Sequence, residues 1–367
     1  MAACNFLFLL IFLIQLHSSV GQPAVKSGYW FPASQFPPSN INSALFTHLF
    51  CGFATLNPQS YQVTIPPPDQ SSFSSFTKTV QQKNPSIKTI LSIGGQRANP
   101  AIFAAMASHP SSRKAFIDSS MKAARDDGFH GLDLYWAYPK TTSQMTHMGV
   151  LIGEWRAAVA AESRASGQPR LILTADVYYT PTLNSLSYPI DPIRKSLDWI
   201  NIAAYDLITP HSSPSATGAP AALFDPSSRL SASFGIEAWI KTRLSAKKLV
   251  MGLPFHGYAW RLADPNKHDE GSPANGPASD GDMGSDGMIG YKQIKEFAIR
   301  NSAPTAYTGA NISSNYCYTD SIWIGFDDYQ TVATKASFAK GKRIRGYYAS
   351  SVGHDDNWVL SKDGKQL

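Results

Sequence analysis

Short apolar runs recur along the chain, and each is bounded by turn residues. Eight of them have the length and residue types of β-strands, and helical patterns lie between them. Two of these helical patterns, residues 111–128 and 148–167, end at a glycine, the usual residue just past a helix C-terminus. The eight runs are KSGYWF near Tyr29, THLFCGF near Phe50, KTILSIGG near Ile90, GLDLYW near Leu134, LILTADV near Leu173, INIAAYD near Ile202, KLVMGLPF near Met251 and RGYYA near Tyr347.

Strands and helices that alternate eight times predict an α/β protein with a closed parallel (β/α)8 TIM barrel. Such a barrel takes ~250 residues, fewer than the 367 present. The surplus falls mainly between the seventh and eighth runs, so we predict a small α+β insertion subdomain in the seventh βα loop, over residues 258–329. The barrel would then comprise residues 22–257 and 330–367. Because that loop leaves the C-terminal face of the barrel, the insertion should form one wall of the ligand cleft.

The N-terminal segment has the pattern of a secretory signal peptide. An apolar stretch from Phe6 to Leu16 precedes small residues at Ser19 and Gly21, and it is too short to span a bilayer. The alternative is a buried N-terminal helix. We predict that residues 1–21 are removed and that the protein is secreted, either to the extracellular space or to a vacuole, with no membrane partner.

Composition narrows the possible partners. The chain is 43% hydrophobic and 16% charged, which is typical of a globular protein. Its net charge is +6, but no run of like charge is long enough to follow a phosphate backbone, so we expect no nucleic-acid partner. The scattered histidines show no ligand spacing, so we expect neither a metal site nor another cofactor. The sequence leaves the oligomeric state open.

Three positions bear on covalent chemistry. Without the signal peptide only Cys51 and Cys317 remain, too few for a disulfide framework, and we predict two unpaired thiols. Asn311, followed by Ile312 and Ser313, is the one standard N-glycosylation acceptor, and it is relevant only if the chain is secreted.

The stretch from Asp127 to Pro139 carries the motif by which the chain can be classified. It reads DGFHGLDLYWAYP and resembles DGxDGxDxDxEYP, the fourth-strand signature of glycoside hydrolase family 18, in particular of the plant class V chitinases. The resemblance runs over nearly the whole mature chain and implies a TIM barrel that binds chitin or another carbohydrate. The further matching motifs are GYWFPAS at Gly28, LFTHLFCGFA at Leu45, LSIGG at Leu91, AYD at Ala204, GLPFHGYAWRLA at Gly252 and GYYASSVGHDDNW at Gly346.

The same resemblance identifies what is absent. Four acidic residues of the family stand where this chain has His130, Asp133, Tyr135 and Ala137, so only Asp133 is kept. In the family the last carboxyl protonates the leaving oxygen, and its neighbour orients the substrate acetamide that attacks the anomeric carbon. Ala137 and Tyr135 occupy these two positions, and alternation along a strand predicts that both point to the barrel interior, as Asp133 does. The sequence therefore predicts that chitinase catalysis has been lost.

Two further departures lie on other strands. Ser350 occupies the position of the family tryptophan that supports the sugar at the cleavage point, and Ala203 replaces a methionine. Tyr205 and Asp206, which the resemblance implies hydrogen bond the acetamide, are kept. The alternative to lost catalysis is that another carboxylate, Asp206 or Asp176, has taken over.

Aromatic residues at C-terminal strand ends are the candidates for ligand binding, since sugar sites combine aromatic faces with a few polar groups. For tryptophans the alternative is simple packing, and for Asp133 it is a core carboxylate bonded to the Ser92 hydroxyl. The predicted ligand-binding residues are Tyr29, Asp133, Tyr135, Tyr205, Asp206, Tyr258, Trp260 and Arg261.

These observations favour a lectin-like protein that binds chitin oligomers or N-glycans without hydrolysing chitin. One alternative is a barrel repurposed as an enzyme on a small plant metabolite, with Tyr135, Asp206 or Asp176 transferring protons. Others are a residually active family 18 glycosidase and a storage or defence protein without a specific ligand.

Overall fold

The computed structural model describes residues 24–32 and 36–363, so the predicted signal peptide lies outside the described residues. All eight predicted runs form strands, and each pairs in parallel with the next. The last strand also pairs in parallel with the first, which closes the barrel and confirms the predicted fold class. In chain order the barrel strands are β1 (Val25–Trp30), β2 (His48–Leu56), β4 (Lys88–Gly94), β5 (Gly131–Tyr135), β6 (Ile172–Tyr178), β9 (Trp199–Ala203), β10 (Leu249–Pro254) and β17 (Gly346–Ser350).

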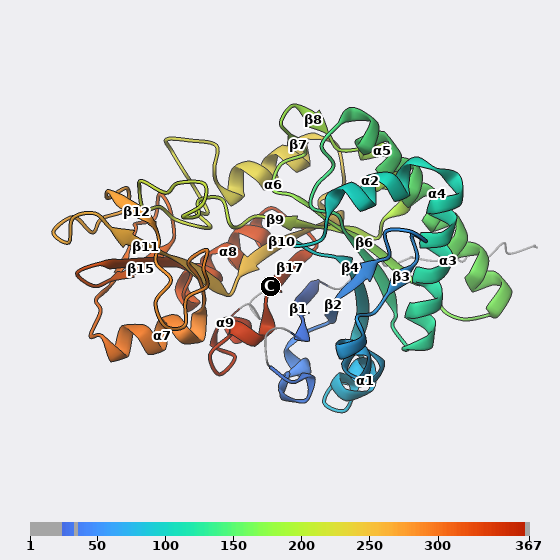
Figure 1. The fold of residues 1–367 in the computed structure, drawn as a ribbon, viewed down its shortest axis with the longest axis horizontal. Coiled ribbons are helices and arrows are strands. Elements are labelled where there is room, and N and C mark those ends of the chain that lie inside the picture. The colour runs from blue at the N-terminus through green and yellow to red at the C-terminus, as the bar shows by residue number, and fades with distance from the viewer. Residues whose placement is uncertain (1–23, 33–35, 364–367) are drawn as a thin grey trace, which may run out of the picture.

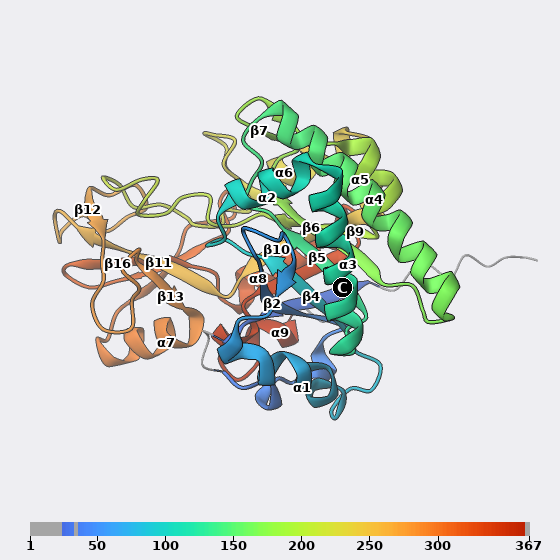
Figure 2. The ribbon, with the colours of Figure 1, turned by 45° about the vertical axis from the view of Figure 1, so that its right-hand side comes forward.

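The helices lie around the outside of these strands (Figures 1 and 2). Their ends follow local capping rules: the Thr141 side chain accepts from the Gln144 backbone N–H at the start of α4, and Gly167, with φ 70°, ends it. The helices are α1 (Gln70–Gln81), α2 (Pro100–Ser108), α3 (Pro110–Asp126), α4 (Thr142–Ser166), α5 (Ile190–Ser196), α6 (Ala232–Lys241), α7 (Tyr291–Arg300), α8 (Tyr329–Gly341) and α9 (Val359–Asp363).

A second sheet of six strands is inserted between β10 and α8, together with α7, and projects to the left in Figure 1. All of its strand pairs are antiparallel, which confirms the predicted α+β insertion after the seventh barrel strand. The sheet starts at His256, slightly before the predicted boundary at 258. Its strands are β11 (His256–Leu262), β12 (Ala274–Pro277), β13 (Met288–Gly290), β14 (Thr305–Tyr307), β15 (Asn315–Tyr318) and β16 (Ile322–Phe326), and the short strands β3 (Val63–Thr64), β7 (Thr182–Leu183) and β8 (Leu186–Ser187) lie outside it.

The apolar core has separate parts. Aliphatic and aromatic side chains fill the layer between the barrel and its helices, with Trp155 and Trp239 among those fully buried. A second cluster, which includes Tyr29, Tyr135 and Tyr348, fills the barrel interior. Cys51 and Cys317 are both buried and unpaired, as predicted. Among the described residues, no helix is both long and apolar enough to cross a membrane.

Candidate ligand-binding cleft

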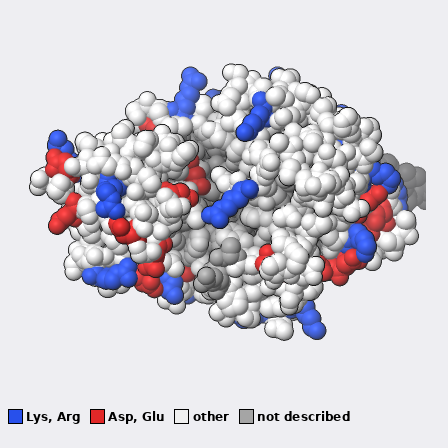
Figure 3. All heavy atoms as spheres, in the orientation of Figure 1, with Lys and Arg blue, Asp and Glu red and all other residues white. Residues whose placement is uncertain are grey.

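A cavity of about 570 Å³ opens where the C-terminal ends of the barrel strands meet the insertion. The barrel contributes loop and strand-end residues, and the insertion contributes one wall, as predicted. Charged side chains of both signs gather over the insertion and at the far edge of the barrel, and Figure 3 shows no extended patch of one sign between them. The residues that line this main cleft are Tyr29, Phe31, Pro32, Gly52, Phe53, Asp69, Gly94, Gln96, Arg97, Tyr135, Tyr205, Asp206, His256, Tyr258, Asp286, Met288, Ser350, Ser351 and His354.

Asp133 on β5 is a core carboxylate. It is fully buried, and it accepts hydrogen bonds from Ser92 Oγ (2.7 Å), Tyr29 Oη (2.9 Å) and Thr174 Oγ1 (2.6 Å). Burial raises the pKa of Asp133, and the three hydrogen bonds oppose that rise. Because Asp133 has these partners and does not line the cleft, it holds the strands β1, β4, β5 and β6 together rather than reaching a ligand.

Tyr135, the last residue of β5, lines the cleft with a phenol where the family has a carboxylate. Its hydroxyl donates to Gln96 Oε1 at 3.1 Å, and its ring packs edge-to-face against Phe53 with centroids 5.3 Å apart. Burial raises the pKa of Tyr135 well above its ordinary value, so the phenol is neutral. Ala137 follows, half-buried against the same cluster, and offers no titratable group.

Two glycines bring Gln96 close to Tyr135. Gly94 has φ 112°, and a Cβ there would lie 2.3 Å from the Tyr135 carbonyl oxygen. Gly95 has φ 92° and donates its N–H to that carbonyl at 3.0 Å. Any residue with a side chain would push the end of β4 away from β5, so the LSIGG motif positions Gln96 beside the phenol.

Asp206 and His256 form an ion pair in the floor of the cleft. His256 Nε2 lies 2.8 Å from Asp206 Oδ1, and His256 Nδ1 lies 3.1 Å from the Ser350 carbonyl oxygen. Both partners are acceptors, so both ring nitrogens carry protons and His256 is an imidazolium. Burial alone would lower the pKa of His256, but the Asp206 carboxylate outweighs burial and raises it. Tyr258 also hydrogen bonds Asp206, so β11 is held to the loop after β9 and to the end of β17.

Tyr348 connects a buried acid to the cleft. Its hydroxyl lies 3.1 Å from Asp176 Oδ2 and 3.2 Å from Tyr205 Oη. Only 1% of Asp176 is exposed, and its Oδ1 atom has no hydrogen-bond partner among the described residues. Burial, and secondly the nearby Asp133, raise the pKa of Asp176 well above its ordinary value. The Tyr348 hydroxyl donates to Asp176 and so opposes this rise, and it also lies within hydrogen-bond distance of the Tyr205 hydroxyl.

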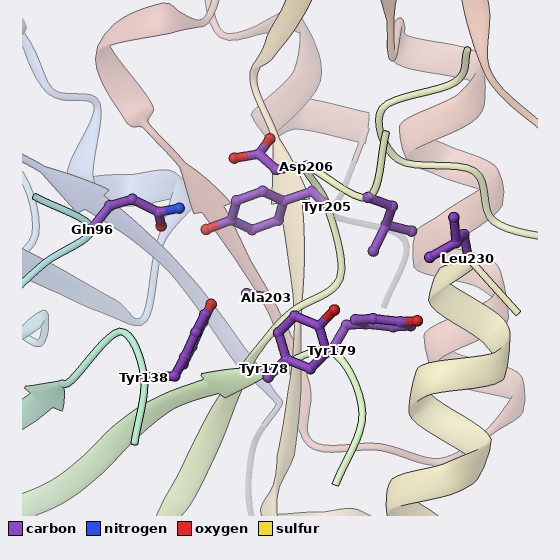
Figure 4. Close-up of a pocket in the computed structure, with 9 residues that line it drawn as sticks. Gln96, Tyr138, Tyr178, Tyr179, Ala203, Tyr205, Asp206 and Leu230 are labelled. Carbon is purple, nitrogen blue, oxygen red and sulfur yellow. The ribbon is translucent and has the colours of Figure 1, made fainter. Parts of the chain in front are cut away.

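A smaller cavity of about 120 Å³ adjoins the main cleft and shares Gln96, Tyr205 and Asp206 with it. We call it the tyrosine pocket, because four tyrosines contribute to its walls (Figure 4). Its remaining lining residues are Tyr138, Tyr178, Tyr179, Ala203, Leu207 and Leu230.

The structure brings five of the predicted ligand-binding residues together in the main cleft: Tyr29, Tyr135, Tyr205, Asp206 and Tyr258. The other three predicted ligand-binding residues, Asp133, Trp260 and Arg261, do not line the main cleft. Trp260 is fully buried, donates Nε1–H to the Ser213 carbonyl oxygen at 2.9 Å and packs on Trp323. Arg261 pairs with Asp280 in a largely exposed ion pair. The physical reason is that β11 runs away from the barrel mouth, so positions beyond Tyr258 no longer reach the cleft.

Several cleft residues did not emerge from the sequence reasoning. Gln96 and Arg97 directly follow the LSIGG strand end, and this position alone could have pointed to them. Asp286 comes from a turn-rich loop and carried no such signal. His354 also lines the cleft, where burial lowers its pKa to about 4 and leaves the ring neutral.

The remaining predicted positions lie away from the cleft. His130 precedes β5 at the opposite end of the barrel, and its Nδ1 lies 3.1 Å from both the backbone nitrogen and Oγ1 of Thr89. Asn311 is exposed in a turn between β14 and β15. Within the described ranges, no three His, Cys, Asp or Glu side chains cluster in a way that could hold a metal ion.

Comparison with known proteins gives a consistent set of relatives. The profile of the family described as Glycosyl hydrolases family 18 matches residues 25–355. Class V chitinase of Arabidopsis thaliana is 49% identical over 356 residues, 97% of this chain and 92% of the relative. A mutant class V chitinase from Nicotiana tobaccum, solved in complex with NAG4, is 49% identical with a TM-score of 0.91, over 94% of this chain and 98% of that one. A chitinase-like agglutinin from Robinia pseudoacacia is 43% identical with a TM-score of 0.86, over 94% and 99% of the two chains.

Proposed function

Since the chain belongs to the glycosyl hydrolases family 18, we propose that its main cleft binds oligosaccharides of N-acetylglucosamine, as chitin oligomers or within N-glycans, without cleaving them. The observation that carries this proposal is at the end of β5, where Tyr135 is the last strand residue and Ala137 follows two positions later, at the places of the two mechanistic carboxyls. The Nicotiana structure with NAG4 and the Robinia agglutinin support a sugar ligand for a barrel of this kind.

The loss of the acid has no evident replacement among the described carboxylates. Asp133 and Asp176 are buried and do not line the cleft, and Asp206 is held by His256. Asp69 and Asp286 are the other carboxylates of the lining, and neither is on a barrel strand. A general acid typically contributes ~10²- to 10⁴-fold, or about 3–5 kcal/mol of barrier, so its removal alone makes hydrolysis very slow.

The binding surface itself is retained. Tyr29, Phe31, Phe53 and Tyr258 supply aromatic faces in the lining, and Tyr205 supplies a hydroxyl. Stacked or edge-on aromatic side chains bury the apolar face of a pyranose, and a few polar groups fix its orientation. These features are those of a sugar-binding cleft that does not need the catalytic carboxyls.

Calorimetric titration of the full chain with chitotetraose tests binding, and chromatography of the same mixture tests cleavage. We expect a saturable heat and no shorter oligomers. Asp206→Ala should weaken binding, since it removes a polar group of the lining, and Asp280→Ala, on the exposed surface of the insertion, is the matched control. The absence of heat with both chitin oligomers and N-glycans would overturn the proposed ligand, and rapid cleavage would overturn the proposed loss of catalysis.

One observation favours a second candidate, an enzyme acting on a small metabolite. Asp176, whose pKa is raised by burial, is linked through Tyr348 to Tyr205, which lines both cavities and is placed to pass a proton to a ligand. Turnover of compounds in a metabolite extract, compared between the wild type and Asp176→Asn, tests this. Turnover that persists unchanged in Asp176→Asn, or no turnover at all, speaks against it.

Secretion also remains a proposal and rests on the N-terminal pattern of the sequence. Mass spectrometry of the protein expressed in plant cells should find a mature N-terminus after Gly21 and glycan on Asn311. An intact N-terminus starting at Met1 would contradict it.

A further inference from the structure

The tyrosine pocket has the size of a single six-membered aromatic ring. Its volume is about 120 Å³. A protein cavity of ~150 Å³ with apolar walls is known to hold benzene. The tyrosine pocket is only slightly smaller and shares Gln96, Tyr205 and Asp206 with the main cleft. Ala203, at the back of the pocket in Figure 4, has the smallest side chain of the lining and leaves this space free.

The walls of the pocket are already arranged as an aromatic cluster. Tyr178 packs edge-to-face with Tyr138, with centroids 5.5 Å apart and planes at 74°, and with Tyr179, at 4.7 Å and 64°. Tyr205 lies opposite them in Figure 4. Edge-to-face and offset contacts are the geometries that aromatic rings prefer, so another planar ring can extend this cluster.

The polar groups of the pocket are the Gln96 amide, the Asp206 carboxylate and the tyrosine hydroxyls. Tyr138 and Tyr178 both line the pocket, and each carries a phenol hydroxyl. Burial raises the pKa of both phenols, so they stay protonated and can donate. Two phenol donors match one or two oxygen substituents on a ring.

A hexose suits this pocket less well. Its hydroxyls surround the ring, and most of them would face tyrosine rings, Ala203, Leu207 or Leu230. Each buried hydroxyl without a partner costs about 1–3 kcal/mol. An aromatic ring carries no such cost, because its faces and edges are apolar.

We propose that the tyrosine pocket binds an aromatic ring joined to the sugar in the main cleft, so that the ligands of this protein are aryl glycosides of N-acetylglucosamine oligomers. The shared residues Gln96, Tyr205 and Asp206 form the passage between the two parts of such a ligand. The inference rests on the proposed function, because it assumes that the sugar occupies the main cleft.

The test compares two ligands that differ only in the aglycone. Phenyl β-chitobioside and methyl β-chitobioside are titrated into the full chain by calorimetry, and the ratio of their dissociation constants is taken for each variant. We expect the phenyl glycoside to bind the wild type about ten-fold more tightly, the gain from burying and packing one ring. Ala203→Met fills the back of the pocket and should bring the ratio close to one. Tyr307→Phe, an exposed tyrosine on β14, is the control and should leave the ratio unchanged.

A further pair of ligands tests whether the pocket hydroxyls donate hydrogen bonds to the ring substituent. The 4-hydroxyphenyl glycoside should gain affinity over the phenyl glycoside in the wild type, and Tyr178→Phe should remove most of that gain without changing the volume of the ring. Tyr178→Phe also guards against misfolding of the Ala203→Met protein, because it removes only one oxygen atom.

The outcomes separate this inference from the proposed function. If both glycosides bind equally well, or if Ala203→Met keeps the preference for phenyl, the inference is overturned while sugar binding stands. If neither glycoside binds, the proposed function fails. The pocket is then tested with phenol alone by NMR: binding that Ala203→Met abolishes supports an aromatic site, and no binding overturns it.

Discussion

Substitution of Asp133 distinguishes a ligand-binding role from a structural role most clearly. The family resemblance places it among ligand-binding residues, whereas the structure buries it under three hydrogen-bond donors, Ser92, Tyr29 and Thr174. In Asp133→Ala all three hydroxyls lose their acceptor inside the barrel. A buried donor left without a partner costs about 1–3 kcal/mol. Tyr29 keeps its bond from Asn201 at 3.0 Å, and the two smaller hydroxyls can rotate, so we expect a total loss of about 3–5 kcal/mol rather than the full sum.

Urea unfolding followed by tryptophan fluorescence and by circular dichroism measures this loss as a lower midpoint. Asp133→Asn keeps the shape and one acceptor oxygen, and we expect it to lose about 1–2 kcal/mol. Asp280→Ala, which breaks the largely exposed pair with Arg261, should change stability by less than about 1 kcal/mol. If Asp133→Ala stays within about 1 kcal/mol of the wild type but no longer binds chitotetraose, the reasoning is wrong and Asp133 is a ligand-binding residue.

Three further predictions concern pH and catalysis. Because the pKa of His256 is raised, its contribution to stability is complete below the ordinary pKa of 6.5 and is lost as the pH rises through the raised pKa. Thermal unfolding midpoints measured from pH 5.5 to 8.5 should show this loss in the wild type and not in His256→Phe. The pKa of Asp176 is also raised, so Asp176→Asn should be more stable than the wild type by a margin that grows with pH, and a constant margin would contradict the raised pKa. Ala137→Glu alone should not cleave chitotetraose, because Tyr135 still occupies the position of the acetamide-orienting carboxylate. Adding Tyr135→Asp and Ser350→Trp should restore slow cleavage that chromatography can detect. Activity in the single variant would contradict the assigned roles.

The eight barrel strands could be predicted from the sequence because their signals are local. A buried parallel strand is a short apolar run, and the helices between the strands begin and end with caps such as Thr141 and Gly167 that act within a few residues. The change of residue type at Tyr135 and Ala137 is likewise visible in the sequence, and no folding information is needed to see that Ala137 cannot donate a proton.

The partners of the cleft residues were decided by the tertiary structure. Asp176 and Tyr348 are 172 residues apart in the chain, and the closed barrel puts them within hydrogen-bond distance. Tyr135 and Gln96 are 39 apart, and the pairing of β4 with β5 brings them together. No local pattern encodes such pairs, because they depend on the register of parallel strands brought together by closure.

The direction of β11 could not be predicted from the sequence either. Alternation places Tyr258 and Trp260 on one face of that strand, and only the tilt of the insertion away from the barrel decides that the first lines the cleft while the second is buried. The tyrosine pocket arises in the same way: its walls come from the ends of separate strands and loops, and their rings meet only because the barrel gathers the C-terminal ends of its strands at one face.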